Sequence, residues 1–184
     1  MDYENKIITV KRDCDAILIP SGDPIKLIKG TQVRITQALG GDYTLFVNGN
    51  LIKISGKDAD VIGEKVAEQP KNNIKVDFTQ SIDENSVWEQ LKTCYDPEIP
   101  VNIVDLGLVY DLEIKKNKEK QNIIYVKMTL TAPGCGMGPV IAQDVEQKIR
   151  TIPGVYDVLV EIVWDPVWDR DMMTDEAKLQ LGML

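Results

Sequence analysis

The chain has 184 residues, of which 43% are hydrophobic and 27% are charged. This length allows one domain or two small ones with a buried core, and the composition excludes a disordered protein. With 29 acidic and 21 basic residues, the net charge of -8 repels phosphate backbones, so nucleic acid is not expected as a partner.

The first residues of the chain, 1–13, lack the long apolar run of a signal peptide. No later stretch approaches the roughly 20 consecutive apolar residues that cross a bilayer. We therefore expect a soluble cytoplasmic protein that has no membrane partner.

Short apolar runs broken by turn residues fill the first part of the chain. Asn48-Gly49 stands between two of these runs, and this pair favours the positive φ angles of a type I′ hairpin turn. The pattern predicts a small all-β barrel or sandwich of about 65 residues. The predicted strands are 5–10, 16–20, 24–28, 31–39, 42–47 and 50–55.

Residues 68–85 are polar and lack helical periodicity, with one short β-like run at 74–78. A stretch of this composition is typical of a linker. It predicts a boundary near residue 80, with a β-rich domain and its linker at 1–80 and a second domain at 81–184.

A helix is predicted to begin at Ser86, because Ser86 and Glu89 have the spacing of a capping box. Pro97 and Pro100 prevent the helix from continuing. The apolar residues at helical spacing are Val87, Leu91 and Cys94.

Two runs of alternating apolar and polar residues, 108–115 and 124–130, predict two strands. The lysine-rich stretch 115–122 between them lacks aromatic residues that could stack on bases. It is therefore interpreted as a solvated hairpin loop.

Pro139 suits the first turn of a second helix, which carries apolar residues at every fourth position from Ile141 to Ile149. A third strand follows within 153–164, and Thr174 is a candidate N-cap for a short terminal helix. The residues expected on one side of the third strand are Tyr156, Val158, Val160, Ile162 and Trp164.

The order helix, strand, strand, helix, strand predicts an α/β layer domain of about 95 residues, with both helices on one face of a three-stranded sheet. Together with the β-rich first domain, this makes the whole chain α+β.

The chain has three cysteines and no histidine. Cys14, Cys94 and Cys135 are odd in number and far apart, which is not the pattern of a disulfide-linked secreted domain. The absence of histidine removes Ser-His and Cys-His catalysis and imidazole metal ligands. We therefore do not expect an enzyme.

The stretch TAPGCGMGPV, residues 131–140, places Cys135 between the end of a strand and the start of a helix. Free backbone N–H groups and the helix dipole stabilise negative charge there, which makes Cys135 a candidate nucleophile or soft-metal ligand. Gly134, Gly136 and Gly138 would leave the sulfur accessible to a cluster. Alternatively, Cys135 is a small hydrophobic residue packed under a tight turn.

A complete metal site needs more donors than the Cys135 loop supplies, because an iron–sulfur cluster usually takes four thiolates. Cys14, Asp105 and Glu98 are the further candidate ligands, and a second subunit or a partner's thiols could also contribute. Cys14 is flanked by acids and Cys94 lies on an apolar helix stripe, so packing roles are the alternative for Cys14 and the expectation for Cys94.

Two other stretches have open interpretations. Asp96, Glu98 and Asp105 could approach the cysteine loop, or they could serve only the turns around the prolines. The stretch WDPVWDRDMM, residues 164–173, could form an exposed contact surface, or its tryptophans could cap the core.

Three segments, 95–112, 128–149 and 153–168, together resemble the PaaD-like domain of metal–sulfur cluster biosynthesis. With residues 13–51 in front, the whole chain resembles the SufT-type iron–sulfur assembly proteins of bacteria. The family's motif cysteine falls on Cys135, and its Asp-Pro-Glu and Asp-Leu-Gly elements fall on 96–98 and 105–107. The SufT-like N-terminal motif falls on 13–15.

This resemblance implies an auxiliary factor that helps to assemble iron–sulfur clusters or pass them to client apoproteins. It implies a labile cluster or iron, bound transiently rather than stably, at Cys135 with Gly134 and Gly136. The expected partners are scaffold or carrier proteins, client apoproteins and, where two subunits share a site, a second copy of the chain. The alternatives are a metal-free adaptor that docks clients through the tryptophan-rich segment and an enzyme with Cys135 as nucleophile.

Overall fold

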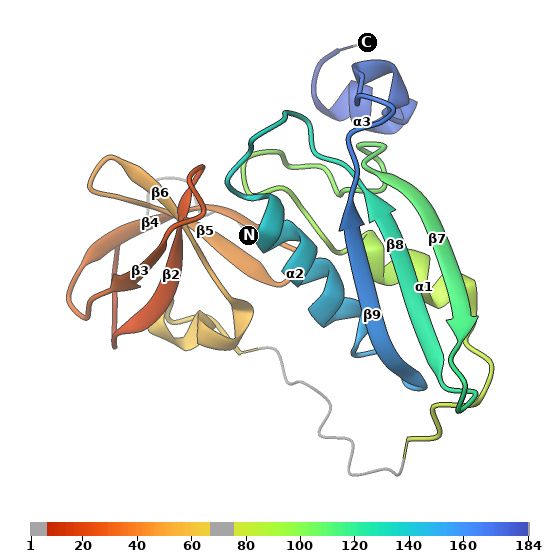
Figure 1. The fold of residues 1–184 in the computed structure, drawn as a ribbon. Coiled ribbons are helices and arrows are strands. Elements are labelled where there is room, and N and C mark those ends of the chain that lie inside the picture. The colour runs from red at the N-terminus through yellow and green to blue at the C-terminus, as the bar shows by residue number, and fades with distance from the viewer. Residues whose placement is uncertain (1–6, 67–75, 184) are drawn as a thin grey trace. The chain divides into compact units, whose positions relative to one another are not determined.

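The computed structural model describes residues 7–66 and 76–183 (Figure 1). The chain divides into two compact units, Met1–Asn72 and Asn73–Leu184. Part of the stretch predicted as a linker, residues 68–75, lies outside the described residues. The boundary predicted at residue 80 stays a prediction, and Asn122 holds the backbone of Phe78 and Gln80 in the second unit through its Nδ2 atom, at 2.8 and 2.7 Å.

The first unit is a six-stranded antiparallel sheet with the strand order β1-β4-β5-β6-β2-β3. All six predicted strands are confirmed, although residues 5 and 6 of the first lie outside the described part. Their inward side chains form one apolar core, in which Leu45 and Ile52 are completely buried. The strands are β1 (Ile8–Thr9), β2 (Cys14–Ile19), β3 (Pro24–Leu27), β4 (Gln32–Leu39), β5 (Asp42–Val47) and β6 (Asn50–Ile54).

The predicted hairpin turn joins β5 to β6. Asn48 and Gly49 have φ angles of 49° and 84°, which are the positive values that a type I′ turn needs at both central positions. A 3₁₀ helix, η1 (Gly56–Ile62), follows β6 and buries Ala59, Val61 and Ile62.

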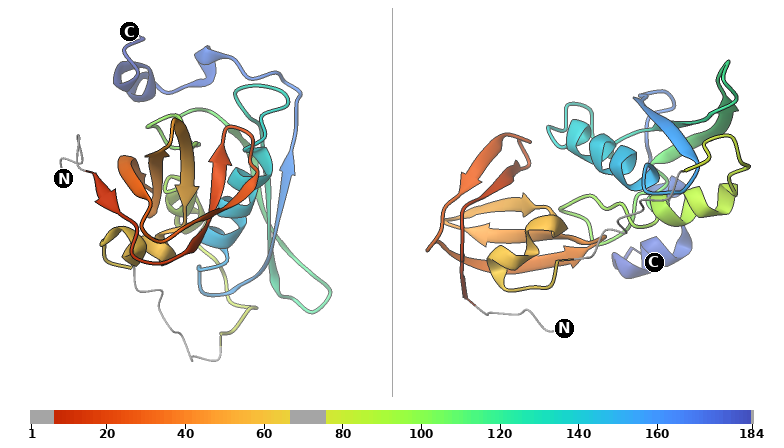
Figure 2. Two further views of the ribbon diagram at one scale, coloured as in Figure 1. Left: turned by 90° about the vertical axis from the view of Figure 1, so that its left-hand side faces the viewer. Right: turned by 90° about the horizontal axis from the view of Figure 1, so that it is seen from below.

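The second unit has the predicted order helix, strand, strand, helix, strand. Its three-stranded sheet has the order β7-β8-β9, antiparallel between β7 and β8 and parallel between β8 and β9. Figures 1 and 2 show α1 and α2 against the same face of this sheet, as predicted. The elements are α1 (Glu84–Leu91), β7 (Val109–Lys116), β8 (Asn122–Met128), α2 (Gly138–Ile149) and β9 (Val155–Ile162).

The capping box predicted at Ser86 is wrong. The N-cap of α1 is Asp83, whose carboxylate accepts a hydrogen bond from the N–H of Asn85 at 3.2 Å. Ser86 instead donates its hydroxyl to the Asp83 carbonyl at 2.6 Å, and Glu89 pairs with Lys92. Because Asp83 is itself a good N-cap, the helix begins one turn earlier and Ser86 becomes part of its first turn.

The predicted facing of the third strand is also wrong in part. Asn122 pairs with Val155 and Ile123 with Asp157, so Tyr156 is the extra residue of an irregularity in the register. Tyr156 is 45% exposed and packs edge-on against Phe78, whereas Val158 on the helix-covered face is buried. Trp164 lies beyond the end of β9 and is 43% exposed.

The segment after β9 runs through a short 3₁₀ turn, η2 (Arg170–Met172), into α3 (Asp175–Gln180). The predicted N-cap is confirmed, because the Thr174 hydroxyl accepts from the N–H of Ala177 at 3.2 Å. The Thr174 N–H donates to the carbonyl of Asp105 at 2.9 Å, which ties this segment to the loop before β7. Among the described residues, no helix is long and apolar enough to cross a membrane.

Candidate functional site

The candidate site is the loop between β8 and α2, which contains Cys135. The Gly138 N–H donates to the Cys135 carbonyl at 3.1 Å, so the cysteine stands immediately before the first turn of α2. Cys135 is half-buried and not disulfide-bonded. Cys135 is therefore partly exposed to solvent, unlike the other two cysteines, and its role as a binding residue stays a prediction.

The N-terminus of α2 carries no compensating charge. Its N-cap, Met137, makes no side-chain capping bond, and the first turn contains no acidic residue. The helix dipole and the backbone N–H groups therefore leave this end positive, which favours a negatively charged group beside it.

The three glycines of the loop differ in what they do. Gly134 is exposed and has a φ of +79°, with open space where a Cβ atom would lie. Gly138 is buried, and a Cβ there would lie 2.6 Å from Cδ1 of Leu130. Gly136 is half-buried. Gly134 thus serves backbone conformation and access, whereas Gly138 permits close packing at the base of the loop.

An apolar pocket of about 270 Å³ lies against the loop. One wall is the stretch that leads to Cys135, and the opposite wall is the tryptophan-containing segment after β9. Its lining residues are Leu130, Thr131, Pro133, Gly134, Trp164, Val167 and Trp168. The sequence pointed to the two tryptophans and the glycine loop separately, but no signal in it joined them.

The two tryptophans of this pocket answer the question that the sequence left open. Trp168 is partly buried and its indole N–H donates to the Leu106 carbonyl at 2.8 Å, so it holds the segment onto the domain. Trp164 is 43% exposed and Val167 is 72% exposed. One tryptophan is therefore structural and the other forms part of an exposed apolar surface.

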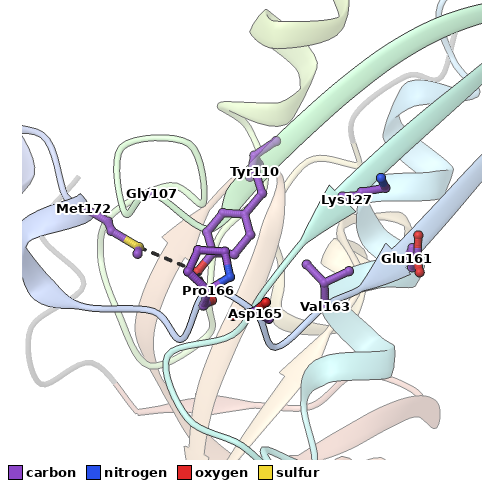
Figure 3. A pocket seen from close by; sticks show the side chains of 9 residues that line it. Gly107, Tyr110, Lys127, Glu161, Val163, Asp165, Pro166 and Met172 are labelled. Carbon is purple, nitrogen blue, oxygen red and sulfur yellow. Dashed lines mark hydrogen bonds between the residues drawn. The ribbon is translucent and has the colours of Figure 1, made fainter.

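A second, larger hollow of about 740 Å³, the sheet groove, lies on the other side of the same segment (Figure 3). Tyr110 lines this groove, and its hydroxyl donates to the Pro166 carbonyl at 2.9 Å and to Sδ of Met172 at 3.6 Å. The sequence analysis missed this groove. Its lining residues are Gly107, Val109, Tyr110, Lys127, Glu161, Val163, Asp165, Pro166 and Met172.

The acidic candidates take part mainly in local turns. The Asp96 carboxylate is buried and accepts from the N–H of Glu98 at 2.9 Å, whereas the Glu98 side chain is exposed. The Asp105 carboxylate accepts from Nδ2 of Asn102 at 2.6 Å. These bonds fit the turn role that the sequence offered as the alternative to metal binding.

The other two cysteines lie in apolar cores. Cys94 is completely buried and its thiol faces the Gln90 carbonyl at 3.7 Å, as expected for a core residue. Cys14 is 4% exposed in the core of the first unit. Burial, together with the negative charge of Asp58, raises the pKa of the Cys14 thiol, and Arg12 opposes this only in part.

A ready-made metal site is not present among residues 7–66 and 76–183. No three cysteine, aspartate or glutamate side chains there lie close enough together to hold a metal ion. The predicted ligands Cys135, Asp105 and Glu98 are therefore not gathered into one three-donor site. The ligand roles of these residues and of Cys14 stay predictions.

Residues 84–162, from α1 to the end of β9, match the family described as iron-sulfur cluster assembly protein. An Fe-S protein maturation auxiliary factor from Porphyromonas gingivalis is 42% identical over 101 residues, which is 55% of this chain and 92% of the relative. The chain belongs to this iron–sulfur cluster assembly family. The family resemblance noted in the sequence is thereby confirmed.

Two further similar proteins cover about half of this chain and nearly all of their own length. The maturation auxiliary factor SufT from Staphylococcus aureus is 46% identical over 48% of this chain and 96% of its own length. A solved domain of unknown function from Bacillus anthracis is 37% identical over 55% of this chain and 92% of its own, with a TM-score of 0.47. This chain is thus considerably longer than these relatives.

Proposed function

We propose that this chain is an auxiliary factor in the maturation of iron–sulfur proteins, which receives a cluster or iron at Cys135 and passes it to client apoproteins. In this role the cluster is cargo and not a resident cofactor. The names of the P. gingivalis and S. aureus relatives support a maturation role. The observation that carries the use of Cys135 is its position: half-buried, in an open glycine loop, at the uncapped N-terminus of α2.

The incomplete donor set supports transfer rather than storage. A thiolate at the positive end of α2 can provide one bond to iron, but a cluster needs about four such ligands. The described residues offer no group of three donors around it. The remaining ligands would come from a partner's thiols or a second subunit, so the cargo would be held weakly and released to a protein that offers a complete site.

A metal-free adaptor is the second candidate function, and two observations favour it. No three-donor group lies in the described parts of the chain, and the exposed side chains of Trp164 and Val167 form a surface that could hold a client without any metal. In this alternative Cys135 takes no part in maturation. No histidine is present to activate Cys135 as an enzymatic nucleophile, so we propose no catalytic reaction.

Anaerobic reconstitution separates the two functions. The full chain is incubated with ferrous iron and sulfide, and its visible absorbance and its transfer of cluster to apo-aconitase are measured. Cys135→Ala should lose both the absorbance and the transfer, whereas Cys14→Ala should retain them. Cys14→Ala is the matched control because it removes a thiol that is buried in the core of the other unit.

Equal loading and transfer by wild type and Cys135→Ala would rule out the cysteine-based role and favour the adaptor. Loss of both signals in Cys14→Ala as well, with Cys14→Ala still folded by circular dichroism, would mean that Cys14 is a ligand after all.

A further inference from the structure

The apolar pocket and the sheet groove lie on two sides of one short segment, residues 163–168. Trp164, Val167 and Trp168 line the pocket, whereas Val163, Asp165 and Pro166 line the groove. Figure 3 shows Met172 toward one end of the groove and Glu161 with Lys127 toward the other, with Asp165 between them beside Pro166. A ligand that crosses this segment would therefore meet the apolar pocket and a groove that contains two carboxylates and one lysine.

The pocket is too small for a typical small-molecule site and suits a single side chain. Its volume is about 270 Å³, below the roughly 300–1,000 Å³ of most ligand pockets. Val167 at its rim is 72% exposed and Trp164 is 43% exposed. Exposed apolar side chains around a hollow are the usual feature of a surface that a protein partner covers.

The groove beside the pocket carries a net negative charge, because Glu161 and Asp165 line it together with one base, Lys127. Lys127 is the cross-strand neighbour of Glu161, but its ammonium lies 3.9 Å from the Asp111 carboxylate, and neither Glu161 nor Asp165 has an ion pair within 4 Å among residues 7–66 and 76–183. Asp169 and Asp171 follow the pocket-lining segment, with Arg170 between them and Lys178 at 3.9 Å from the Asp171 carboxylate. Charge complementarity therefore calls for a basic partner.

We propose that residues 163–168 form a docking site for a partner's segment in which one bulky apolar side chain is flanked by lysine or arginine. The apolar side chain enters the pocket and the basic side chains lie over Glu161 and Asp165. A second copy of this chain fits less well, because its net charge of -8 would repel the same acidic surface.

The position of the pocket links docking to Cys135. Gly134, the residue before Cys135, lines the pocket together with Trp164. A segment anchored there would hold its protein beside the thiol, which raises the effective concentration of any ligand that the partner supplies. The docking site adds the chemistry of the partner to the proposed function. Only the link between docking and Cys135 rests on that function.

The test is a titration of the ¹⁵N-labelled full chain with capped synthetic peptides that have a central leucine or phenylalanine between pairs of lysines. Glutamate-flanked and alanine-centred peptides are the matched comparisons. The three tryptophan indole signals report the site, because Trp164 and Trp168 line the pocket and Trp88 lies in α1. Single Trp→Phe variants assign them.

The lysine peptides should shift the Trp164 and Trp168 signals and leave Trp88 unmoved. Affinity should fall at least tenfold with either comparison peptide, and it should fall as salt is raised. Val167→Glu should abolish binding, and the charge-neutralising pair Glu161→Gln with Asp165→Asn should weaken it and flatten the salt dependence. Leu179→Glu is the control, since Leu179 is also exposed, at 69%, but lines neither hollow.

Three results would overturn the proposal. They are the absence of shifts with both lysine peptides, equal binding of the glutamate peptides, and shifts of the same indole signals with protein concentration alone, which would identify a second copy as the occupant. The titration contains no iron, so a negative result would not contradict the proposed cluster transfer. A negative result in the cluster-transfer experiment would likewise not contradict peptide binding.

Discussion

Leu130 and Gly138 are in close contact across the base of the Cys135 loop. A Cβ atom added to Gly138 would lie 2.6 Å from Cδ1 of Leu130 and 3.5 Å from Cδ1 of Ile162. Leu130 also lines the apolar pocket and is 4% exposed. The packing that fixes the start of α2 is thus the same packing that shapes the pocket beside the cysteine.

Gly138→Ala should therefore destabilise the second unit by about 1–3 kcal/mol, the usual cost of forcing an extra carbon into a packed core. Urea unfolding followed by tryptophan emission reports this unit, because all three tryptophans lie in it. Shortening the opposing side chain with Leu130→Val should reduce the cost of Gly138→Ala. Equal costs in the two backgrounds would mean that the contact is not what limits this position.

Thiol reactivity should follow exposure. Native protein treated with iodoacetamide and analysed by mass spectrometry should be modified first at Cys135, because Cys14 and Cys94 are buried in the two cores. Cys14 and Cys94 should react only after urea unfolding. Early modification of either would contradict the packing described for that cysteine.

The strand pattern of this chain is largely predictable, because alternation of apolar and polar residues reports directly which face of a sheet is buried. The Asn48-Gly49 turn is predictable for the same local reason, since few residue pairs accept two positive φ angles. Local rules fail where two solutions are equally good. Asp83 and Ser86 are both good N-caps, and the sequence alone does not choose between them.

Side-chain facing is less predictable, because one inserted residue reverses it. Tyr156 in β9 and Tyr110 in β7 both lie at shifts in register, and no sequence signal marks either shift. The Cys135 loop could be predicted from its glycines. The sheet groove could not, because Tyr110 and its partners Pro166 and Met172 lie 56 and 62 positions apart in the sequence.

The raised pKa of Cys14 gives the first unit a dependence on alkaline pH. Because the folded thiol holds its proton more tightly than the unfolded one, its contribution to stability is complete below the unfolded pKa of about 8.5 and is lost as the pH rises toward the folded value. Cys14→Val should remove this loss.

The measurement is urea unfolding by circular dichroism at about pH 7 and about pH 10, on either side of the free-thiol pKa. The difference in unfolding free energy between Cys14→Val and wild type should shift in favour of the variant at the higher pH. An unchanged difference would show that the Cys14 thiol ionises equally easily in both states.

Replacing Trp168 by phenylalanine should lower stability, whereas the same replacement of Trp164 should not. Trp168→Phe removes the indole N–H that donates to the Leu106 carbonyl at 2.8 Å, so it should cost about 1–3 kcal/mol. It should also increase amide hydrogen exchange in η2 and α3, which follow it. Trp164→Phe should leave stability unchanged, since its exposed ring has no such bond in the described structure. Similar amide hydrogen exchange of η2 and α3 in the two variants would contradict the anchoring role of Trp168.

Lys148 joins α2 to the end of α1 from a position that is largely shielded from water. Its ammonium donates to the Thr93 carbonyl at 2.6 Å, at the C-terminal end of α1, and to Asp144 at 3.0 Å within α2. The side chains of Lys148 and Asp144 are only 18% and 13% exposed. Removal of the ammonium would leave both the carbonyl and the carboxylate without this donor.

Lys148→Met keeps the aliphatic length and should lower the unfolding free energy of the second unit by about 1.5–3 kcal/mol, the usual value for a hydrogen bond to a charged group. Lys92→Met is the matched control. Lys92 also pairs with a carboxylate, that of Glu89 at 3.0 Å, but the two side chains are 46% and 71% exposed, so solvent screens the pair and little change is expected. Equal losses in the two variants, measured by tryptophan emission in urea, would mean that shielding from water does not set the strength of the Lys148 contacts.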